Sequence, residues 1–358
     1  MNVRPFALTV AICCTTTLYA QKQDPYKHVD SDVRLDAIRH SQVWMPGDIA
    51  SNDMKAGPQD VPSFPPEAVA NCEYVEEKVT GTPKFNCAIS PDDKVRVKYG
   101  PYNGEVYAEA AATRLLWSLG FGADRVYPVT VLCHGCPEFP SEDYKRSKET
   151  RRYPSAIIER KMPGDEITVG RTEGWSWVEL SFVDQTAGGA PLAHRDALKL
   201  LAAMIQHTDN KPQQQRLVCL DRVKSLQPEP AVRCKHAFMM INDLGKTFGR
   251  ATMSNGDLES AVNFKAWSST PIWKDEKACV ANLSKSFTGS LEHPKISEDG
   301  RKFLSGLLAQ LTDQQLRDLF EVAHFSKRDP KVSVDDWVRV FKEKRDAIAN
   351  ARCTNPVL

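Results

Sequence analysis

The sequence predicts an α+β protein with a β-rich part over residues 71–160 and a mainly helical part over residues 161–358. Three observations predict this fold class. Between residues 73 and 99, apolar and polar residues alternate in short runs separated by turn residues, which is typical of strands. Later in the chain, apolar residues recur at helical spacing, as they do over residues 197–205. The cysteines that follow residue 20 are even in number, which indicates disulfide bonds.

The chain has 358 residues, which favours two domains or one two-lobed unit with a large buried core. Positive and negative side chains nearly cancel, with 47 Lys and Arg against 46 Asp and Glu. This balance argues against nucleic acid and against an anionic membrane surface as partners. The charged fraction of 26% is that of an ordinary soluble globular protein.

The amino terminus has the outline of a secretory signal peptide over residues 1–20. Arg4 precedes a short apolar run over residues 6–14, and cleavage fits after Ala20. This run is too short to span a bilayer, and no later stretch reaches about 18 apolar residues. We therefore expect an exported protein, periplasmic or extracellular, without a membrane span.

Eight cysteines follow the predicted signal peptide, and in an exported chain they are expected to form disulfides. Sequence alone leaves the connectivity open, because eight cysteines allow about 105 pairings. Nearness along the chain suggests these pairs: Cys72 with Cys87, Cys133 with Cys136, Cys219 with Cys234, and by remainder Cys279 with Cys353.

The motif Cys133-His134-Gly135-Cys136 admits three interpretations: a small disulfide loop, half of a zinc site, or a thiol redox centre. Zinc requires two further ligands nearby, and redox motifs of this spacing are expected at the start of a helix. Here Pro137 and a polar loop follow instead. The pattern favours the disulfide loop.

The elements of the first half can be placed from their patterns. Residues 21–70 are polar and rich in proline, so we expect an irregular arm there. One helix is predicted over residues 104–119, and Gly120 ends it. The predicted strands are residues 73–79, 85–89, 94–99, 126–132 and 155–160.

Two short acidic motifs follow each other in the helical part. The apolar helix of residues 197–205 leads into His207-Thr208-Asp209-Asn210. Two predicted strands, residues 216–220 and 237–241, then frame a long hairpin, and the second strand leads into Asp243-Leu244-Gly245. The order is therefore helix, Asp loop, strand, hairpin, strand and Asp-x-Gly.

Phosphoryl transfer requires groups in this order. One carboxylate orients the attacking hydroxyl and takes its proton, and a second holds the divalent ions that neutralise the phosphates. The two motifs resemble the protein-kinase catalytic loop followed by Asp-Phe-Gly. An Asp-x-Gly motif followed by Phe248-Gly249 is more similar to the atypical kinases: the secreted Golgi casein kinases, the HipA-type kinases and the phosphoinositide kinases.

This resemblance implies a two-lobed protein-kinase-like fold, a β-rich small lobe and a mainly helical large lobe that carries both acidic motifs. It implies ATP with Mg or Mn as the cofactor. Lys98 stands where the kinase lysine holds the α- and β-phosphates, and a glutamate of the following helix holds that lysine. The surrounding alanines make Glu109 more similar than Glu105 to that glutamate.

In the large lobe, the resemblance implies Asp209 as the catalytic base and Asp243 with Gln214 as metal ligands. Backbone groups from Glu159 to Lys161 would meet the adenine of the nucleotide. The acceptor would be a hydroxyl of a protein, a lipid or a small molecule. The sequence indicates neither the acceptor nor the oligomeric state.

The chain departs from the kinase pattern at three places. Gln214 replaces the expected Asn, and its longer side chain displaces the amide oxygen. Leu244 replaces the Phe of Asp-Phe-Gly. No Gly-x-Gly-x-x-Gly loop is present, and the turn over residues 80–84 is the only candidate to cover the phosphates.

Simpler interpretations stay open. Asp209 and Asp243 are residues of a type that often caps turn amides, and His207 is expected to brace its loop rather than act as a base. A catalytically silent pseudokinase, or a secreted binding module, would keep the fold without the chemistry. A third hypothesis is a thiol oxidoreductase at Cys133 and Cys136.

Overall fold

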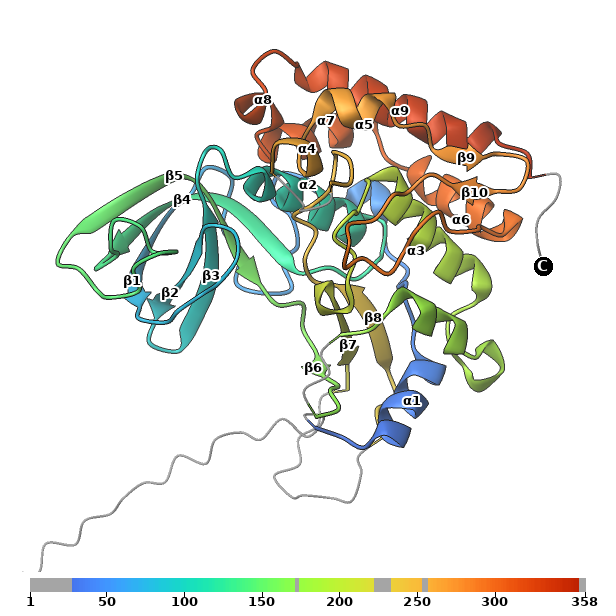
Figure 1. The fold of residues 1–358 in the computed structure, drawn as a ribbon, viewed down its shortest axis with the longest axis horizontal. Helices are drawn as coiled ribbons and strands as arrows, with labels where there is room; N and C mark the ends of the chain where they lie inside the picture. The colour runs from blue at the N-terminus through green and yellow to red at the C-terminus, as the bar shows by residue number, and fades with distance from the viewer. Residues whose placement is uncertain (1–27, 171–173, 222–232, 253–256, 354–358) are drawn as a thin grey trace, which may run out of the picture.

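The computed structural model describes residues 28–170, 174–221, 233–252 and 257–353. The predicted signal peptide lies outside the described residues. Strands β1 to β5 gather on one side of the molecule, and most helices with the remaining strands lie on the other (Figure 1). The protein is therefore a mixed α and β structure, with its β-rich part first in the sequence, as the residue patterns predict.

The β-rich part is a closed five-stranded barrel with strand order β1-β2-β3-β5-β4. Neighbouring strands are antiparallel, except that β1 and β4 pair in parallel and close the barrel. The strand patterns do not predict this closure, because β1 and β4 are far apart in the sequence. The strands are β1 (Val69–Val75), β2 (Lys84–Ser90), β3 (Asp93–Tyr99), β4 (Arg125–His134) and β5 (Thr150–Arg160).

Helix α2 (Gly104–Ser118) lies between the barrel and the helical part (Figure 1). Asn103 caps its first turn by accepting a hydrogen bond from the Glu105 N–H at 3.2 Å. Every residue of the helix except Trp117 is buried. A helix that is buried all round must find partners for its polar side chains inside the protein. This burial explains why its two glutamates are directed into ion pairs.

The two acidic motifs are carried by a small sheet and a long helix. Helix α3 (Leu192–Met204) ends just before the Asp209 loop, and the 3-10 turn η4 (Pro212–Gln214) follows that loop. Strands β7 (Gln215–Cys219) and β8 (Ala237–Ile241) pair antiparallel, with β6 (Asp165–Glu166) at the edge. All residues of β7 and β8 are buried.

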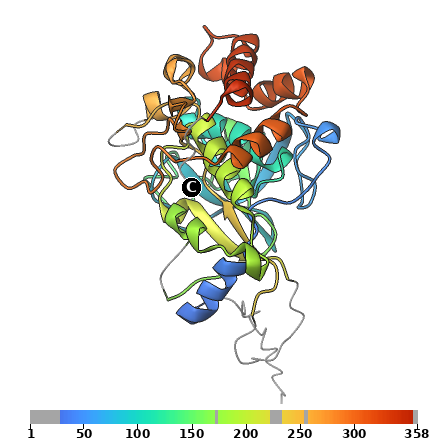
Figure 2. The ribbon, with the colours of Figure 1, turned by 90° about the vertical axis from the view of Figure 1, so that its right-hand side faces the viewer.

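Of the remaining helices, α6 packs on α3, whereas α4, α7 and α8 pack on α2. Figure 2 shows α1 and α9 at opposite ends of the molecule. Capping boxes begin α7 at Thr312 and α9 at Ser333. The further elements are α4 (Asp257–Ser260), α5 (Phe264–Ser269), β9 (Trp273–Asp275), β10 (Val280–Ala281), α6 (Glu298–Leu308), α7 (Asp313–Val322), α8 (Phe325–Arg328), α9 (Val334–Asn350), η2 (Trp177–Phe182) and η3 (Gln185–Ala187).

The amino-terminal arm differs from the irregular segment that we expected. It contains helix α1 (Ser31–His40) and the 3-10 turn η1 (Ile49–Ser51). Val33, Ala37 and Ile38 of α1 are buried, although the helix is polar on average. The chain then donates from the Gln42 N–H to the Ala237 carbonyl at 2.9 Å. Tertiary packing forms this helix where local propensity is weak.

Four disulfides join the cysteine pairs suggested by the sequence: Cys72–Cys87, Cys133–Cys136, Cys219–Cys234 and Cys279–Cys353. The first joins β1 to β2, and the third joins the end of β7 to the segment before β8. The disulfide interpretation of Cys133 and Cys136 is therefore confirmed. Among the described residues, no helix combines the length and apolar character needed to cross a membrane.

Candidate functional site

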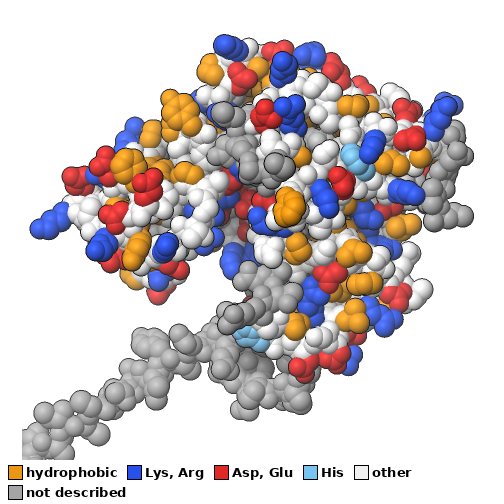
Figure 3. Space-filling view, viewed as in Figure 1, with side chains coloured by type: hydrophobic (Ala, Val, Ile, Leu, Met, Phe, Trp, Pro, Cys, Tyr) orange, Lys and Arg blue, Asp and Glu red, His pale blue; other side chains and the backbone are white. Residues whose placement is uncertain are grey.

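The candidate site lies between the barrel and the larger part of the protein. Figure 3 shows a groove there, with basic and acidic side chains on its inner wall. Strand β3, helix α2 and the end of β5 form one wall. The loop after α3 and the Asp-x-Gly segment after β8 form the other.

Lys98 of β3 is the centre of the first wall, and its side chain is only 2% exposed. Its Nζ donates to Glu109 Oε2 at 2.6 Å and lies 3.0 Å from Glu159 Oε1. Two more carboxylates approach at longer range: Glu105 Oε2 at 3.5 Å and Asp243 Oδ1 at 3.6 Å. The structure therefore brings Lys98 together with three of the predicted residues and with Glu105.

This arrangement decides between the two candidate glutamates of α2. Glu109 is the closer partner of Lys98, as the sequence suggested. Glu105 nevertheless joins three segments: it accepts from the Thr82 hydroxyl at 2.7 Å, and its Oε1 lies 3.2 Å from Lys246 Nζ. Sequence reasoning set Glu105 aside. Its position one helical turn before Glu109 is the signal that places both on one face.

Carboxylates outnumber cations around Lys98, and this excess of negative charge shifts the pKa values of the group. Burial by itself lowers the pKa of Lys98, but the surrounding carboxylates, led by Asp243 and Glu109, raise that pKa well above its usual value. Burial also raises the pKa of Glu109 well above its usual value, and the nearby Glu159 charge adds to this rise. Glu109 therefore takes a proton at a higher pH than an ordinary glutamate does.

Asp243 behaves in the opposite way. Burial raises its pKa, but the Lys98 charge and the hydrogen bond from the Gly245 N–H outweigh this effect and lower the pKa to about 2. That hydrogen bond, from Gly245 N to Asp243 Oδ1, is 3.1 Å long. A permanently ionised carboxylate is the kind of hard oxygen donor that Mg²⁺ and Mn²⁺ prefer.

Asp209 dominates the second wall. Its Oδ2 accepts from Lys211 Nζ at 3.0 Å and from Gln214 Nε2 at 2.9 Å. Its Oδ1 is buried and has no hydrogen-bond partner among the described residues. A carboxylate oxygen left without a donor is available to accept a proton from a bound hydroxyl.

Gln214 is placed differently from the metal ligand that we expected. Its amide nitrogen faces Asp209, so the side chain orients that carboxylate. Its backbone carbonyl accepts from the Asn242 N–H at 2.9 Å and the Asp243 N–H at 3.3 Å. Gln214 therefore ties the two acidic motifs together through its backbone.

Further backbone bonds fix the two motifs side by side. The Thr208 N–H donates to the Lys246 carbonyl at 3.1 Å, and the Phe248 N–H donates to the Ile205 carbonyl at 2.7 Å. Gly245 lies against the α2 helix, because a Cβ there would come within 2.8 Å of Glu105 Cγ. Only glycine allows the backbone this close approach.

His207 is fully buried, and neither ring nitrogen has a hydrogen-bond partner among the described residues. Burial lowers its pKa to about 4, against the opposing charges of Asp209 and Asp243. The imidazole is therefore neutral at pH 7. This agrees with a role in packing the loop.

The backbone beyond Glu159, where we expected adenine to bind, is partly engaged. The Met162 N–H donates to Asp124 Oδ1 at 2.8 Å, and Asp124 also binds Arg216 of β7. Burial raises the pKa of Asp124 to about 6, although the Arg216 charge opposes the rise. The Glu159 side chain itself points to Lys98 and not along the connection.

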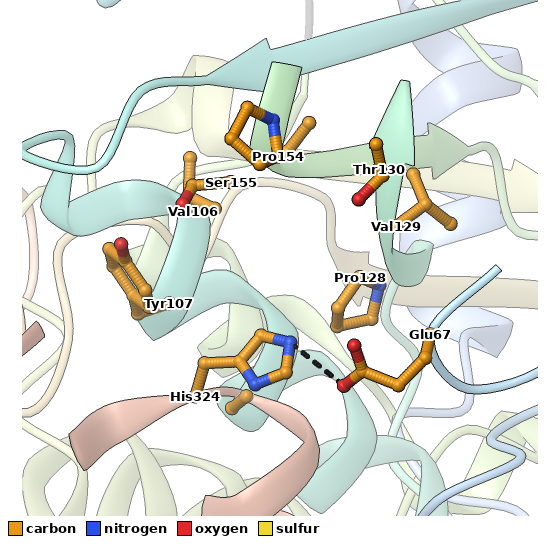
Figure 4. A pocket seen from close by; sticks show the side chains of 11 residues that line it. Glu67, Val106, Tyr107, Pro128, Val129, Thr130, Pro154, Ser155 and His324 are labelled. Carbon is orange, nitrogen blue, oxygen red and sulfur yellow. Dashed lines mark ion pairs between the residues drawn. The ribbon is translucent and has the colours of Figure 1, made fainter. Parts of the chain in front are cut away.

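A separate cavity lies on another face of the barrel, beside α2 and α8 (Figure 4). Its volume is about 20 Å³, which is room for a single water molecule. His324 Nε2 and Glu67 Oε1 face each other across it at 3.5 Å. The cavity is too small for a nucleotide, so it is not the candidate site.

Comparison with known proteins assigns neither a family nor a function to this chain. No family model matches the sequence, and no curated protein matches it. Among solved structures, the chain is similar to the crystal structure of a Helicobacter pylori proinflammatory kinase, CtkA. The identity is 11% and the TM-score 0.37, over 80% of this chain and 100% of that chain. The functional proposal below therefore rests on the geometry of the site.

Proposed function

We propose that this protein is an exported, atypical kinase-like phosphotransferase that moves the γ-phosphoryl group of ATP to a hydroxyl group. The barrel with α2 would be the small lobe and the helical part the large lobe. One observation carries the proposal: Lys98, Glu109 and Asp243 come from three distant segments and meet within 3.6 Å of the lysine nitrogen. Asp209 lies on the neighbouring loop, which backbone hydrogen bonds fix to the Asp243 segment.

Each residue has a role that its surroundings support. Lys98 would bind the phosphates, and Glu109 would orient the lysine. Asp243 would hold Mg or Mn, because its low pKa keeps it ionised. Asp209 would take the proton of the acceptor hydroxyl through its unpartnered Oδ1. The bound cation would neutralise the charge that builds up on the phosphates.

Two predicted roles are less direct. Gln214 would offer its amide oxygen to the cation only after the amide turns away from Asp209. Glu159 would contribute by holding Lys98 with its side chain, beside any contact of the following backbone with adenine. Both roles stay predictions that nucleotide-binding measurements on single variants can check.

A catalytically silent nucleotide-binding or protein-binding module is the second candidate. The specific observation in its favour is that four carboxylates already surround Lys98, which is 2% exposed. A lysine with this many anionic partners must exchange some of them to meet phosphates. The thiol oxidoreductase hypothesis has less support, because both Cys133 and Cys136 are buried and joined in a disulfide.

Thermal unfolding with Mn²⁺ and ATP tests the proposal. At millimolar ligand, a site with a micromolar dissociation constant stabilises the folded state by about 4 kcal/mol. We expect this stabilisation in the wild type and its loss in Asp243→Ala. Absence of any shift in the wild type at millimolar Mn-ATP would contradict the proposed function. The four disulfides are compatible with the export that the function assumes.

A further inference from the structure

A tight turn beside the Asp209 loop presents a phenylalanine to solvent. The Gly289 N–H donates to the Ser286 carbonyl at 3.0 Å, which puts Phe287 and Thr288 at the tip of the turn. The Phe287 side chain is 88% exposed, the highest value for a large hydrophobic side chain among the described residues.

The turn is attached on both sides of Asp209. Before this residue, the Thr208 carbonyl accepts from the Ser286 N–H at 2.9 Å. After it, Asn210 Oδ1 accepts from the Leu291 N–H at 2.8 Å, and Asn210 Nδ2 donates to the Leu291 carbonyl at 3.0 Å. The position of Phe287 is therefore fixed relative to the candidate base.

Two more features keep the turn rigid. Ser290 donates to Asn210 twice, from its N–H to Oδ1 at 2.7 Å and from its hydroxyl to the backbone carbonyl at 3.1 Å. Gly289 leaves no space for a side chain, since a Cβ there would come within 2.9 Å of Asn210 Oδ1. An aromatic ring on such a support loses little conformational freedom when it binds a partner.

We propose that Phe287 selects the phosphoryl acceptor, by receiving an apolar side chain of a polypeptide whose hydroxyl lies at Asp209. This inference rests on the function proposed above and adds the class of the acceptor. The exposed ring buries little surface within the protein, so it is free to bury apolar surface against a partner. Aromatic side chains are also the residues that most often dominate binding at protein interfaces.

A short peptide can span the distance between Phe287 and Asp209. Neighbouring Cα atoms are about 3.8 Å apart, so the hydrogen bond between Ser286 and Thr208 keeps the Cα atoms of Phe287 and Asp209 within roughly 13 Å. An extended peptide covers this span with three or four residues at about 3.3 Å each.

The neighbours of Phe287 refine the partner. Lys285 is exposed and has no ion pair among the described residues, which favours a carboxylate in the same peptide. Ser284 and Thr288 are also exposed and polar, so the ring stands alone and not within a broad apolar face. A membrane surface would require such a face. The acceptor is therefore expected to carry one apolar and one acidic side chain close to the hydroxyl.

Peptide phosphorylation with the full chain, Mn²⁺ and γ-labelled ATP tests the inference. The peptides carry a central Ser, Thr or Tyr, and a Leu is scanned from four residues before it to four residues after it. We expect the wild type to prefer Leu at one of these positions. Phe287→Ala should raise the KM for the preferred peptide about tenfold, a loss of about 1.4 kcal/mol, and remove the preference.

Two further variants separate binding from folding. Phe287→Leu should keep most of the preference, because it keeps an apolar side chain. Phe139→Ala is the matched control: Phe139 lies in the loop between β4 and β5, is 56% exposed, and should leave the KM unchanged. Retained stabilisation by Mn-ATP in Phe287→Ala shows that this variant is folded.

The outcomes are distinguishable. An unchanged KM and an unchanged Leu preference in Phe287→Ala, with label transfer by the wild type, overturn this inference and leave the proposed function standing. Phe287-dependent binding to phosphatidylserine vesicles, without an effect on peptides, also overturns it in favour of a lipid surface. A wild type that neither binds Mn-ATP nor transfers label overturns the proposed function and this inference with it.

Discussion

The two walls of the groove satisfy their charged groups in different ways. The barrel wall is formed by β3, α2 and the end of β5, and the loop wall by the loop after α3 and the segment after β8. Lys98 of the barrel wall is buried, and four carboxylates, including Asp243 of the loop wall, lie within 3.6 Å of its nitrogen. On the loop wall, one carboxylate oxygen of Asp209 has no hydrogen-bond partner among the described residues, and the Phe287 side chain is exposed to solvent. The anionic partners of Lys98 therefore all come from the protein, one of them being Asp243 of the loop wall, whereas Asp209 Oδ1 can still accept a hydrogen bond from a ligand.

This difference predicts which residues contribute mainly to folding stability and which contribute mainly to the reaction. The charges around Lys98 compensate one another, so the removal of one of them should mainly lower the free energy of unfolding. The Asp209 Oδ1 acceptor, which has no partner among the described residues, adds nothing to stability, so a substitution of Asp209 should mainly lower the turnover rate. The four predictions below test this division, from the largest expected change in stability to the smallest.

Removal of the central cation should have the largest effect. Lys98→Met leaves two buried and two partly buried carboxylates without their positive partner, and we expect a loss of about 3–5 kcal/mol in the free energy of unfolding at pH 7. The loss should shrink at pH 5, because Glu109, whose pKa is already raised, takes a proton. Urea unfolding at both pH values measures this. An equal loss at both would contradict the charge account.

Loss of the Cys219–Cys234 disulfide, which lies between the two acidic motifs in the sequence, should have the second-largest effect on stability. Cys219 and Cys234 are 15 residues apart, and opening a loop of this size costs about 3 kcal/mol. We expect this loss in the unfolding free energy of the double Ser variant. The matched control opens the Cys133–Cys136 loop of 3 residues, where the entropic loss is smaller. A larger loss in the control would show that loop length does not set the effect.

The close approach of the Asp-x-Gly segment to α2 predicts a smaller change. Gly245→Ala brings a methyl group within 2.8 Å of Glu105, so overpacking should destabilise by about 1–3 kcal/mol. Gly306→Ala in α6 is the control, because its new methyl group meets nothing within 4 Å. That helix substitution should be neutral or stabilising by up to about 1 kcal/mol. Differential scanning calorimetry of both variants makes the comparison.

The smallest expected change concerns Asp243. Its folded pKa, about 2, lies below its ordinary value of 3.8, so ionisation stabilises the fold above pH 4. This contribution should be lost as the pH falls from 4 to 2. The difference in unfolding free energy between wild type and Asp243→Asn should therefore be constant from pH 6 to 4 and shrink below pH 4. A difference that grows on acidification has the wrong sign for this account.

Local patterns predicted the elements of this protein better than their assembly. The alternation around Lys98 and the helical spacing around Glu109 gave β3 and α2 closely, and short separations gave the disulfides. Closure of the barrel was not predicted, because the parallel pairing of β1 with β4 depends on tertiary packing. Helix α1 was missed for the same reason: its buried face is only three residues wide.

The residues of the candidate site that could be named from the sequence are those that lie within a short recognisable motif. Residue order brought Lys98, Glu109, Asp209 and Asp243 into consideration. The structure brings Lys98, Glu109 and Asp243 together and joins the Asp209 loop to the Asp243 segment by backbone hydrogen bonds. The contacts of Glu105, Lys246 and Phe287 had no such motif. Their roles depend on which loops lie beside them, and a single sequence carries little information about neighbours in space.

The most direct test of the central claim is transfer of the γ-phosphoryl group itself. Purified wild type with Mn²⁺ and γ-labelled ATP should place label on Ser, Thr or Tyr hydroxyl groups of the protein or an added peptide. Asp209→Asn should lower the rate at least about 100-fold while it keeps the stabilisation by Mn-ATP. Absence of label from the wild type, or an undiminished rate in Asp209→Asn, would contradict the account.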